Sequence, residues 1–194
     1  MRSHSFPKKF GLLLSLFCIC LPMWCATNAS PSEPEEGFLS PEKYTNAFFG
    51  FSLPLPRDPA FHIARVSSSG TLIREHTLFG VAQEKGSTLF YIAAQQMDSK
   101  EAEQLMRAAQ QTSIRGKEFS KGVSHQKKAG GTQWTAMYLT FIDGYLLSFN
   151  IYSYDRSIAE DLQHCVEGTR FFDPSKAHEV AGASSREYNP ALSH

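Results

Sequence analysis

The sequence has few cysteines and no excess charge of either sign. Of its four cysteines, Cys18, Cys20 and Cys25 lie in the N-terminal segment, which leaves Cys165 alone in the rest of the chain. A single thiol cannot form an intramolecular disulfide, so the fold must be stabilised by its hydrophobic core. Basic and acidic residues number 19 each, which gives a formal net charge of zero. This balance provides no strong field for binding nucleic acid or an anionic membrane.

The sequence signatures of catalysis are also missing. There is no His-Glu-x-x-His, Gly-x-Ser-x-Gly, phosphate-binding Gly-rich loop or paired Cys-x-x-Cys. Ser-x-x-Lys occurs at Ser40–Lys43 and Ser124–Lys127, but the companion motifs of Ser–Lys hydrolases are absent. His62, His76 and His125 are scattered and do not have the spacing of metal ligands. The sequence therefore predicts no catalytic residue, no metal ligand and no cofactor.

The N-terminal segment has the layout of an export signal. Three basic residues precede an apolar run from Phe10 to Leu21. This run is short for a membrane-spanning helix, which needs about 20 residues. Thr27 and Ala29 are small, as the positions before a signal peptidase site require. We therefore predict that residues 1–29 are a signal peptide, cleaved between Ala29 and Ser30.

Two other interpretations of this segment stay open. A lipoprotein signal needs a small residue directly before the acylated cysteine, but the preceding residues here are the bulky Phe17, Ile19 and Trp24. An uncleaved signal helix would instead anchor the chain in the membrane. Cleavage predicts an exported protein, periplasmic or extracellular, with no stable membrane insertion.

The rest of the chain is predicted to form one domain between two segments with little to bury. Residues 30–43 are rich in Pro and Glu, and residues 175–194 are rich in Ala and Ser. We expect a flexible linker and a disordered tail, respectively. The domain at residues 44–174 is long enough for a core of ordinary size.

Apolar periodicity predicts the elements of this domain. Strands are expected around residues 49–53, 61–66, 71–83, 87–97, 117–128 (an edge strand) and 169–172. A helix capped by Asp98 should bury one face, made of Ala102, Leu105, Met106 and Ala109. A second helix should begin at a capping box of Ser157 and Glu160, bury the face that includes Cys165, and end at Gly168.

The clearest local signal is a β-hairpin. Residues 133–142 and 145–154 flank Asp143-Gly144, a preferred two-residue turn. This turn pairs Ile142 with Tyr145, and both faces of the resulting hairpin carry many apolar residues. We therefore expect the hairpin to be covered on both sides, in the middle of an α+β fold with a mainly antiparallel sheet and helices packed on both faces.

The order of these elements resembles the PsbP-like superfamily. The resemblance covers residues 44–174 and is carried by an apolar opening motif, Tyr44, Asn46, Phe49, Gly50, Phe51, Ser52, Leu53 and Pro54. It implies an antiparallel sheet sandwiched between helices, in an exported bacterial member without an assigned role. The family consists mostly of binding and assembly proteins, and none of its functional motifs is found in this chain.

Three aromatic side chains are candidates for a partner-binding surface. Trp134, Tyr152 and Tyr154 lie at the end of the hairpin away from its turn. Aromatic residues with polar tips are enriched at protein interfaces. Packing against a helix also explains them, and is the favoured explanation.

Two functions are consistent with these observations. The first is a non-enzymatic binding or assembly module of the cell envelope, with a protein partner that the sequence does not identify. The alternative is a small secreted hydrolase whose site forms from residues distant in sequence, including His76 or His125. A pocket in which one of these histidines lies within hydrogen-bonding distance of a carboxylate or hydroxyl would favour the hydrolase. Histidines that each lie alone on the surface would exclude it.

Overall fold

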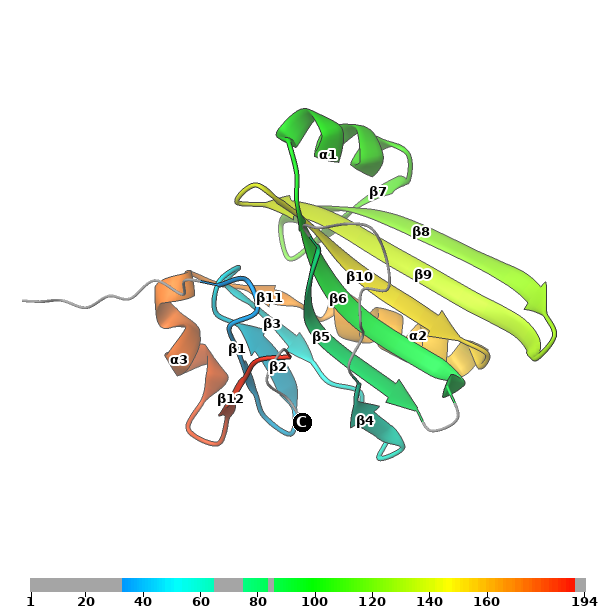
Figure 1. The fold of residues 1–194 in the computed structure, drawn as a ribbon, viewed down its shortest axis with the longest axis horizontal. Coiled ribbons are helices and arrows are strands. Elements are labelled where there is room, and N and C mark those ends of the chain that lie inside the picture. Colours follow the sequence, from blue (N-terminus) through cyan, green and yellow to red (C-terminus); the bar gives the residue numbers. More distant parts are fainter. Residues whose placement is uncertain (1–32, 65–74, 84–85, 191–194) are drawn as a thin grey trace, which may run out of the picture.

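The computed structural model describes residues 33–64, 75–83 and 86–190 of the 194-residue chain. These residues form two antiparallel sheets and three α-helices (Figure 1). The α+β class with mainly antiparallel sheet is therefore confirmed. The predicted signal peptide, with its cleavage site at Ala29 and Ser30, lies outside the described residues.

The large sheet has seven strands in the spatial order β4-β5-β6-β10-β9-β8-β7. Its strands are β4 (Phe61–Ile63), β5 (Glu75–Gln83), β6 (Thr88–Gln96), β7 (Gln110–Ile114), β8 (Lys117–Lys128), β9 (Gly131–Ile142) and β10 (Tyr145–Ser153).

The small sheet has five strands in the spatial order β11-β3-β2-β1-β12. Its strands are β1 (Gly37–Leu39), β2 (Lys43–Asn46), β3 (Phe51–Pro54), β11 (Arg170–Phe171) and β12 (Arg186–Tyr188). Both chain ends of the described region thus contribute strands to this sheet.

The helices are α1 (Ser99–Arg107), α2 (Arg156–Glu167) and α3 (Ala177–Ala181), with a short 3-10 turn at Pro174–Lys176 before α3. The small sheet and α2 contact one face of the large sheet, while α3 packs on β1 and β2. Helix α1 packs on the other face, over Leu139 and Leu146. We expected helices alone to cover a single sheet, but here a second sheet supplies much of one layer.

The hairpin has the predicted register. Ile142 pairs with Tyr145, and Tyr138 pairs with Phe149. Asp143 and Gly144 both have positive φ, at 51° and 82°. This turn type requires positive φ at both central residues, which is why the dipeptide predicts the register so well.

The strand at 117–128 is also found, but it is an edge strand only in part. The strand β7 pairs with its first residues, from Lys117 to Lys121. Beyond Lys121, β8 pairs with β9 only, and the two strands form the long extension in Figure 1. The sequence of β7 is largely polar, so apolar periodicity did not reveal it.

Both predicted helices are present, but the buried face of α1 and the capping residue of α2 differ from the prediction. Asp98 caps α1 by accepting a hydrogen bond from the Lys100 backbone at 2.9 Å. Leu105 is 45% exposed, so the predicted buried face of α1 is wrong at this position. Helix α2 is capped by Asp155, which accepts from Ser157 N at 2.8 Å, and not by the predicted Ser157. An earlier carboxylate reaches the same free N–H groups, and Ser157 already lies inside the helix.

The predicted linker and tail both contribute to the small sheet, so the boundaries 44–174 are too narrow. The strand β1 lies in the predicted linker, and α3 and β12 lie in the predicted tail. Leu39 pairs with Arg186, which joins these two segments directly. A strand of three residues is too short to show a recognisable periodic pattern in the sequence. These strands form because they pair with each other.

Tyr44 links the two sheets and explains the opening motif. Its ring is fully buried and stacks on Phe79 of the large sheet at 4.6 Å between centroids. The β5 strand is bulged between Thr77 and Phe79, and the Leu78 carbonyl there accepts a hydrogen bond from the Tyr44 hydroxyl at 3.1 Å. Asn46 donates to the same hydroxyl at 3.0 Å. Burial raises the pKa of Tyr44, which keeps the hydroxyl protonated as a donor.

Gly50 is required by its close approach to another segment. Its φ is +62°, and a Cβ at this position would lie 2.3 Å from the Phe172 carbonyl oxygen. The motif residues Tyr44, Asn46 and Gly50 therefore serve the packing of the two sheets and of the chain that follows α2.

Candidate functional site

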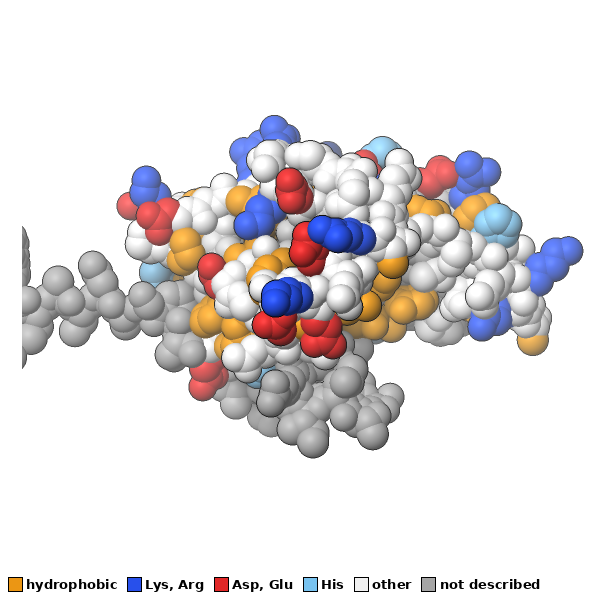
Figure 2. Space-filling view, turned by 90° about the horizontal axis from the view of Figure 1, so that it is seen from above, with side chains coloured by type: hydrophobic (Ala, Val, Ile, Leu, Met, Phe, Trp, Pro, Cys, Tyr) orange, Lys and Arg blue, Asp and Glu red, His pale blue; other side chains and the backbone are white. Residues whose placement is uncertain are grey.

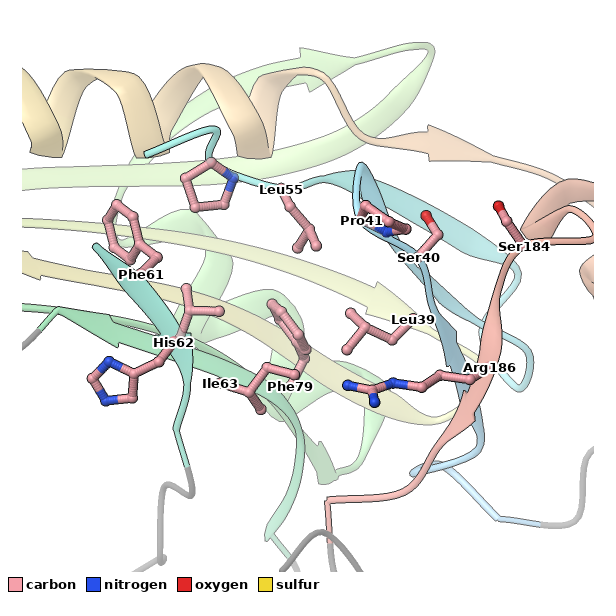
Figure 3. Close-up of a pocket in the computed structure, with 12 residues that line it drawn as sticks. Leu39, Ser40, Pro41, Leu55, Phe61, His62, Ile63, Phe79, Ser184 and Arg186 are labelled. Atoms are coloured by element: carbon pink, nitrogen blue, oxygen red, sulfur yellow. The ribbon is translucent and has the colours of Figure 1, made fainter. Parts of the chain in front are cut away.

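An apolar groove lies between the two sheets, at the side where each sheet ends in a short strand. Its volume is about 410 Å³, within the range of about 300–1,000 Å³ that is usual for ligand sites. Its walls come from β1, the turn after it, the end of β3, β4, β5 and β12 (Figure 3). The lining residues are Leu39, Ser40, Pro41, Leu55, Pro56, Phe61, His62, Ile63, Phe79, Val81, Ser184 and Arg186.

The floor of the groove is continuous with the hydrophobic core. Phe79 is fully buried, Val81 is 5% exposed and Leu39 is 7% exposed. All three belong to the main cluster of core residues. By contrast, Ile63 on the rim is 39% exposed, although it is a large apolar residue. The groove therefore offers apolar surface that the described residues leave accessible.

Of the described residues that line the groove, Arg186 is the one with a full charge at neutral pH. It lies on β12, and its side chain extends beneath Leu39 toward Ile63 and Phe79 (Figure 3). Ser40 and Ser184 supply hydroxyl groups near the same end of the groove. The Ser40 hydroxyl already exchanges hydrogen bonds with the Lys43 backbone at 3.2 Å, which shapes the turn after β1.

Strand alternation explains why Arg186 faces the groove. Residues two apart in a strand point to the same side. Tyr188 lies two residues after Arg186 and is 7% exposed, with its ring 5.7 Å from the rings of Tyr44 and Phe79. Arg186 is therefore on the inward side of β12, while Glu187 between them points away.

A smaller hollow lies between α2 and the extension of β8 and β9. Its volume is about 220 Å³, and its lining includes Trp134, Arg156 and Glu160. The Trp134 ring is flanked by His125, at 5.0 Å between centroids, and by the Arg156 guanidinium at 5.3 Å. Arg156 in turn donates to Glu160 at 2.7 Å. Trp134, which was predicted to contact a partner, therefore packs against side chains of its own chain.

The structure does not bring the three predicted aromatic residues together. Trp134 pairs with Ser153, so Tyr152 points to the opposite face of the large sheet. There, Tyr152 stacks on Tyr91 at 6.2 Å between centroids. Tyr154 is 38% exposed, and its ring lies beside the β8–β9 turn at Gly130. Their role in binding a partner stays a prediction, but they do not form one patch.

The histidines differ in their surroundings. His76 contacts the Glu35 carboxylate through Nδ1, and His125 packs on Trp134. His62 is exposed on β4, and its ring points away from the groove in Figure 3. The contact between His76 and Glu35 meets one part of what the hydrolase hypothesis required, because a carboxylate can orient the imidazole, but neither residue lines the groove or the smaller hollow.

Other chemistry-bearing groups are less suited to catalysis. Burial, followed by the charge of Asp161, raises the pKa of the Cys165 thiol to about 11, which disfavours the nucleophilic thiolate. In the part of the chain that the structure describes, no group of three His, Cys, Asp or Glu side chains could hold a metal ion. Within the same residues, no helix is long and apolar enough to cross a membrane.

The exposed surface of α1 carries both signs of charge. Figure 2 looks onto this helix and shows basic and acidic side chains interspersed, with hydrophobic side chains visible at its flanks. Glu103 and Arg107 form an ion pair at 2.6 Å there. Such a mixed surface is typical of a solvated helix face.

Comparisons with known proteins return distant structural likenesses only. No family model matches the chain, and no curated protein matches it in sequence. A solved structure from Bacteroides thetaiotaomicron is 9% identical, with a TM-score of 0.49, covering 68% of this chain and 48% of its own. This chain thus spans about half the length of that protein.

Two further structures match at similar levels. LpqN of Mycobacterium tuberculosis, described as involved in cell envelope biogenesis, is 11% identical, with a TM-score of 0.46 over 63% of this chain and 83% of its own. The cyanobacterial PsbP of Synechocystis is 8% identical, with a TM-score of 0.38 over 70% of this chain and 93% of its own. Scores at this level do not establish a shared function.

Sequence reasoning missed the groove because five of its twelve lining residues come from the segments predicted as linker and tail. Leu39, Ser40 and Pro41 lie in the former, and Ser184 and Arg186 in the latter. The alternation of Arg186, Glu187 and Tyr188 was the available signal for a strand. Three residues are too few to distinguish such a pattern from a chance arrangement.

Proposed function

We propose that the protein is an exported, non-enzymatic binding module of the cell envelope, which holds the apolar part of a ligand or partner in the groove between its sheets. The observation that carries this proposal is the accessible apolar groove of about 410 Å³, whose lining, as far as the described residues form it, contains one charged side chain and no carboxylate. Largely apolar concave sites with few polar groups are the usual form of a small-molecule or peptide site.

Export is supported by the layout of the N-terminal segment, with its basic residues and short apolar run. The PsbP-like architecture, a sheet between helices, is supported by the order of elements and by the helices α1 and α2 against the large sheet. Mass spectrometry of the protein from the producing cell tests the first point. A mature chain that begins at Ser30 supports cleavage and release, and a chain that retains residues 1–29 contradicts it.

Binding in the groove is tested with a neutral apolar dye, N-phenyl-1-naphthylamine, whose fluorescence rises in apolar surroundings. Ile63→Asp places a charge among the apolar lining, and we expect dye binding to fall by about tenfold, since an apolar dye would have to displace the water that hydrates this carboxylate. Ile63 is 39% exposed, so the variant should remain folded.

Met137→Asp is the matched control. Met137 is 38% exposed, nearly the same as Ile63, but it lies on β9 outside the groove. Dye binding should be unchanged in this variant. Equal losses in the two variants, or no dye binding by the wild-type protein, would contradict a binding site in the groove.

A second candidate function, a hydrolase, is favoured by the contact between His76 and Glu35. This contact supplies a base with an orienting carboxylate, although no nucleophile is assigned to it. Incubation with p-nitrophenyl esters tests the hypothesis: activity that is lost in His76→Asn would support it. Activity equal in wild type and His76→Asn would exclude this pair as its source.

A further inference from the structure

We infer that the groove is specific for a single-chain anionic amphiphile, a long-chain carboxylate, whose head group pairs with Arg186. This inference rests on the proposed binding function and adds the chemical class of the ligand. It follows from three features of the groove: its apolar floor, the inward position of Arg186, and the balance of charge in its lining.

The floor suits an alkyl chain. Leu55, Phe61 and Ile63 present accessible apolar surface, and the nearly buried Phe79, Val81 and Leu39 form the floor beneath it. Each methylene group moved from water onto such a surface raises the affinity by about fourfold. A chain of several methylene groups along this floor would therefore supply most of the binding free energy without any polar contact.

Arg186 suits the head group. Its guanidinium lies over this apolar surface, and the structure gives it no ion pair with a described residue. A guanidinium presents a planar fork that binds a carboxylate through two parallel hydrogen bonds. Apolar walls on one side of the pair reduce the competition from water and strengthen it.

The charge balance favours a carboxylate over a phosphate. Among the described residues, the lining contains one full positive charge and no carboxylate, so an anion entering the groove meets no repulsion from these residues. A carboxylate carries one negative charge, which Arg186 neutralises. A phosphate monoester carries about −1.5 to −2 at neutral pH, and part of its charge would remain uncompensated.

Arg186 also has a purely structural explanation. An inward-pointing charge on an edge strand prevents that strand from pairing with a second molecule. The strand β12 is at the edge of the small sheet, so this explanation applies to it. The two explanations make different predictions for a variant without the charge.

The experiment measures displacement of N-phenyl-1-naphthylamine from the full chain by four ligands with the same alkyl chain: dodecanoate, dodecanol, dodecyl phosphate and dodecyltrimethylammonium. We expect dodecanoate to bind about tenfold more tightly than dodecanol, because a charge-assisted hydrogen-bonded pair is added to the same apolar contact. In Arg186→Gln, dodecanoate should bind no better than dodecanol, while dodecanol binding is unchanged.

Arg170→Gln is the matched control, because Arg170 is also exposed but lies on β11, at the opposite edge of the small sheet. This variant should keep the full preference for dodecanoate. The melting temperature of each variant shows whether it is folded.

The possible results separate the inference from the function on which it rests. If dodecanol and dodecanoate bind equally, the groove binds apolar ligands but the assignment of Arg186 is overturned. If neither ligand displaces the dye in the wild-type protein, the proposed function itself fails. Tighter binding of dodecyl phosphate than dodecanoate would overturn the choice of carboxylate. An Arg186→Gln protein that dimerises but keeps its ligand preference would assign Arg186 to edge protection.

Discussion

The space between the two sheets is filled at one end and open at the other. At the filled end, the rings of Phe51, Phe119, Phe149 and Phe171 form a chain of contacts with centroids 5.8–6.4 Å apart. At the open end, the groove exposes the rim residue Ile63 and admits the charged Arg186. The same pair of sheets thus contains a sealed aromatic core and an accessible apolar groove.

The difference follows from the elements that border each end. The filled end is also bordered by a short strand, β11, which has two residues, but there the twelve-residue helix α2 contacts β3, β9 and β10. The open end is bordered by β4 and β12, which have three residues each. Short strands bring few side chains, so they leave apolar surface uncovered that a helix would bury. A binding groove can therefore arise where the layers end in short strands and no helix covers the apolar surface.

The largest expected effect is at the filled end. Phe119 is fully buried and touches both Phe149 and Phe171. Phe119→Ala should lower the free energy of unfolding by about 3–5 kcal/mol, because it leaves a cavity that rigid neighbouring rings cannot close. Urea denaturation measures this loss. Phe119→Leu, which keeps most of the volume, should cost less than half as much, and equal costs would show that this end is not tightly packed.

A smaller effect is expected at the floor of the groove. Val81 is 5% exposed, and Val81→Ala removes two methyl groups that face an already accessible space. The loss in unfolding free energy should be about 1.5 kcal/mol, from the transfer of these groups alone and without a closed cavity. Urea denaturation under the same conditions gives the comparison. A loss as large as that of Phe119→Ala would mean that the groove is closed in solution.

The smallest effect concerns a polar cluster beside the filled end. The Tyr138 hydroxyl donates to Glu167 at 2.8 Å, and Lys121 Nζ donates to the same oxygen at 2.9 Å. Burial acts to raise the pKa of Glu167, but the hydrogen bonds from Lys121 and Tyr138 outweigh it, so the pKa lies below the ordinary value of 4.5. The ionised form is favoured in the folded state, and its contribution is lost as the pH falls below 4.5 and through the folded-state pKa.

Glu167→Gln should therefore be less stable at neutral pH, by up to about 1 kcal/mol because the side chain is 41% exposed and screened by solvent. Its stability should also fall less than that of the wild type on acidification. Glu160→Gln, which removes an exposed partner of Arg156 on the same helix, is the control and should change stability by less than about 0.5 kcal/mol. Parallel pH profiles for wild type and Glu167→Gln would refute the coupling.

Much of the large sheet could be predicted from the sequence, because its strands are long and its hairpin turn is specific. Asp143-Gly144 determines the pairing of β9 with β10, and alternating apolar residues identify both strands. Helix α1 could be placed from Asp98, whereas the start of α2 was misplaced because Asp155 and Ser157 are both good caps. The strand β7 was missed because its residues, Gln110–Ile114, are mostly polar.

The candidate site could not be predicted, since it depends on pairings between distant segments. The register of Leu39 with Arg186 joins residues from the two ends of the described chain. Neither segment has the length or the apolar content to form a strand alone. Trp134 and Tyr152, which the sequence placed in one surface, lie on opposite faces because Trp134 pairs with Ser153, and successive residues of a strand point to opposite sides.

The sequence by itself determined the central hairpin, the positions of α1 and α2, and the balance of charge, since these depend on local turn chemistry, periodicity and composition. Only the tertiary structure decided that β1 and β12 extend the small sheet, that β4 lies at an edge of the large sheet, and that Arg186 enters an apolar groove between the sheets. Three-residue strands are stabilised by their neighbours and not by their own sequence, so their place becomes visible only when the sheets are assembled.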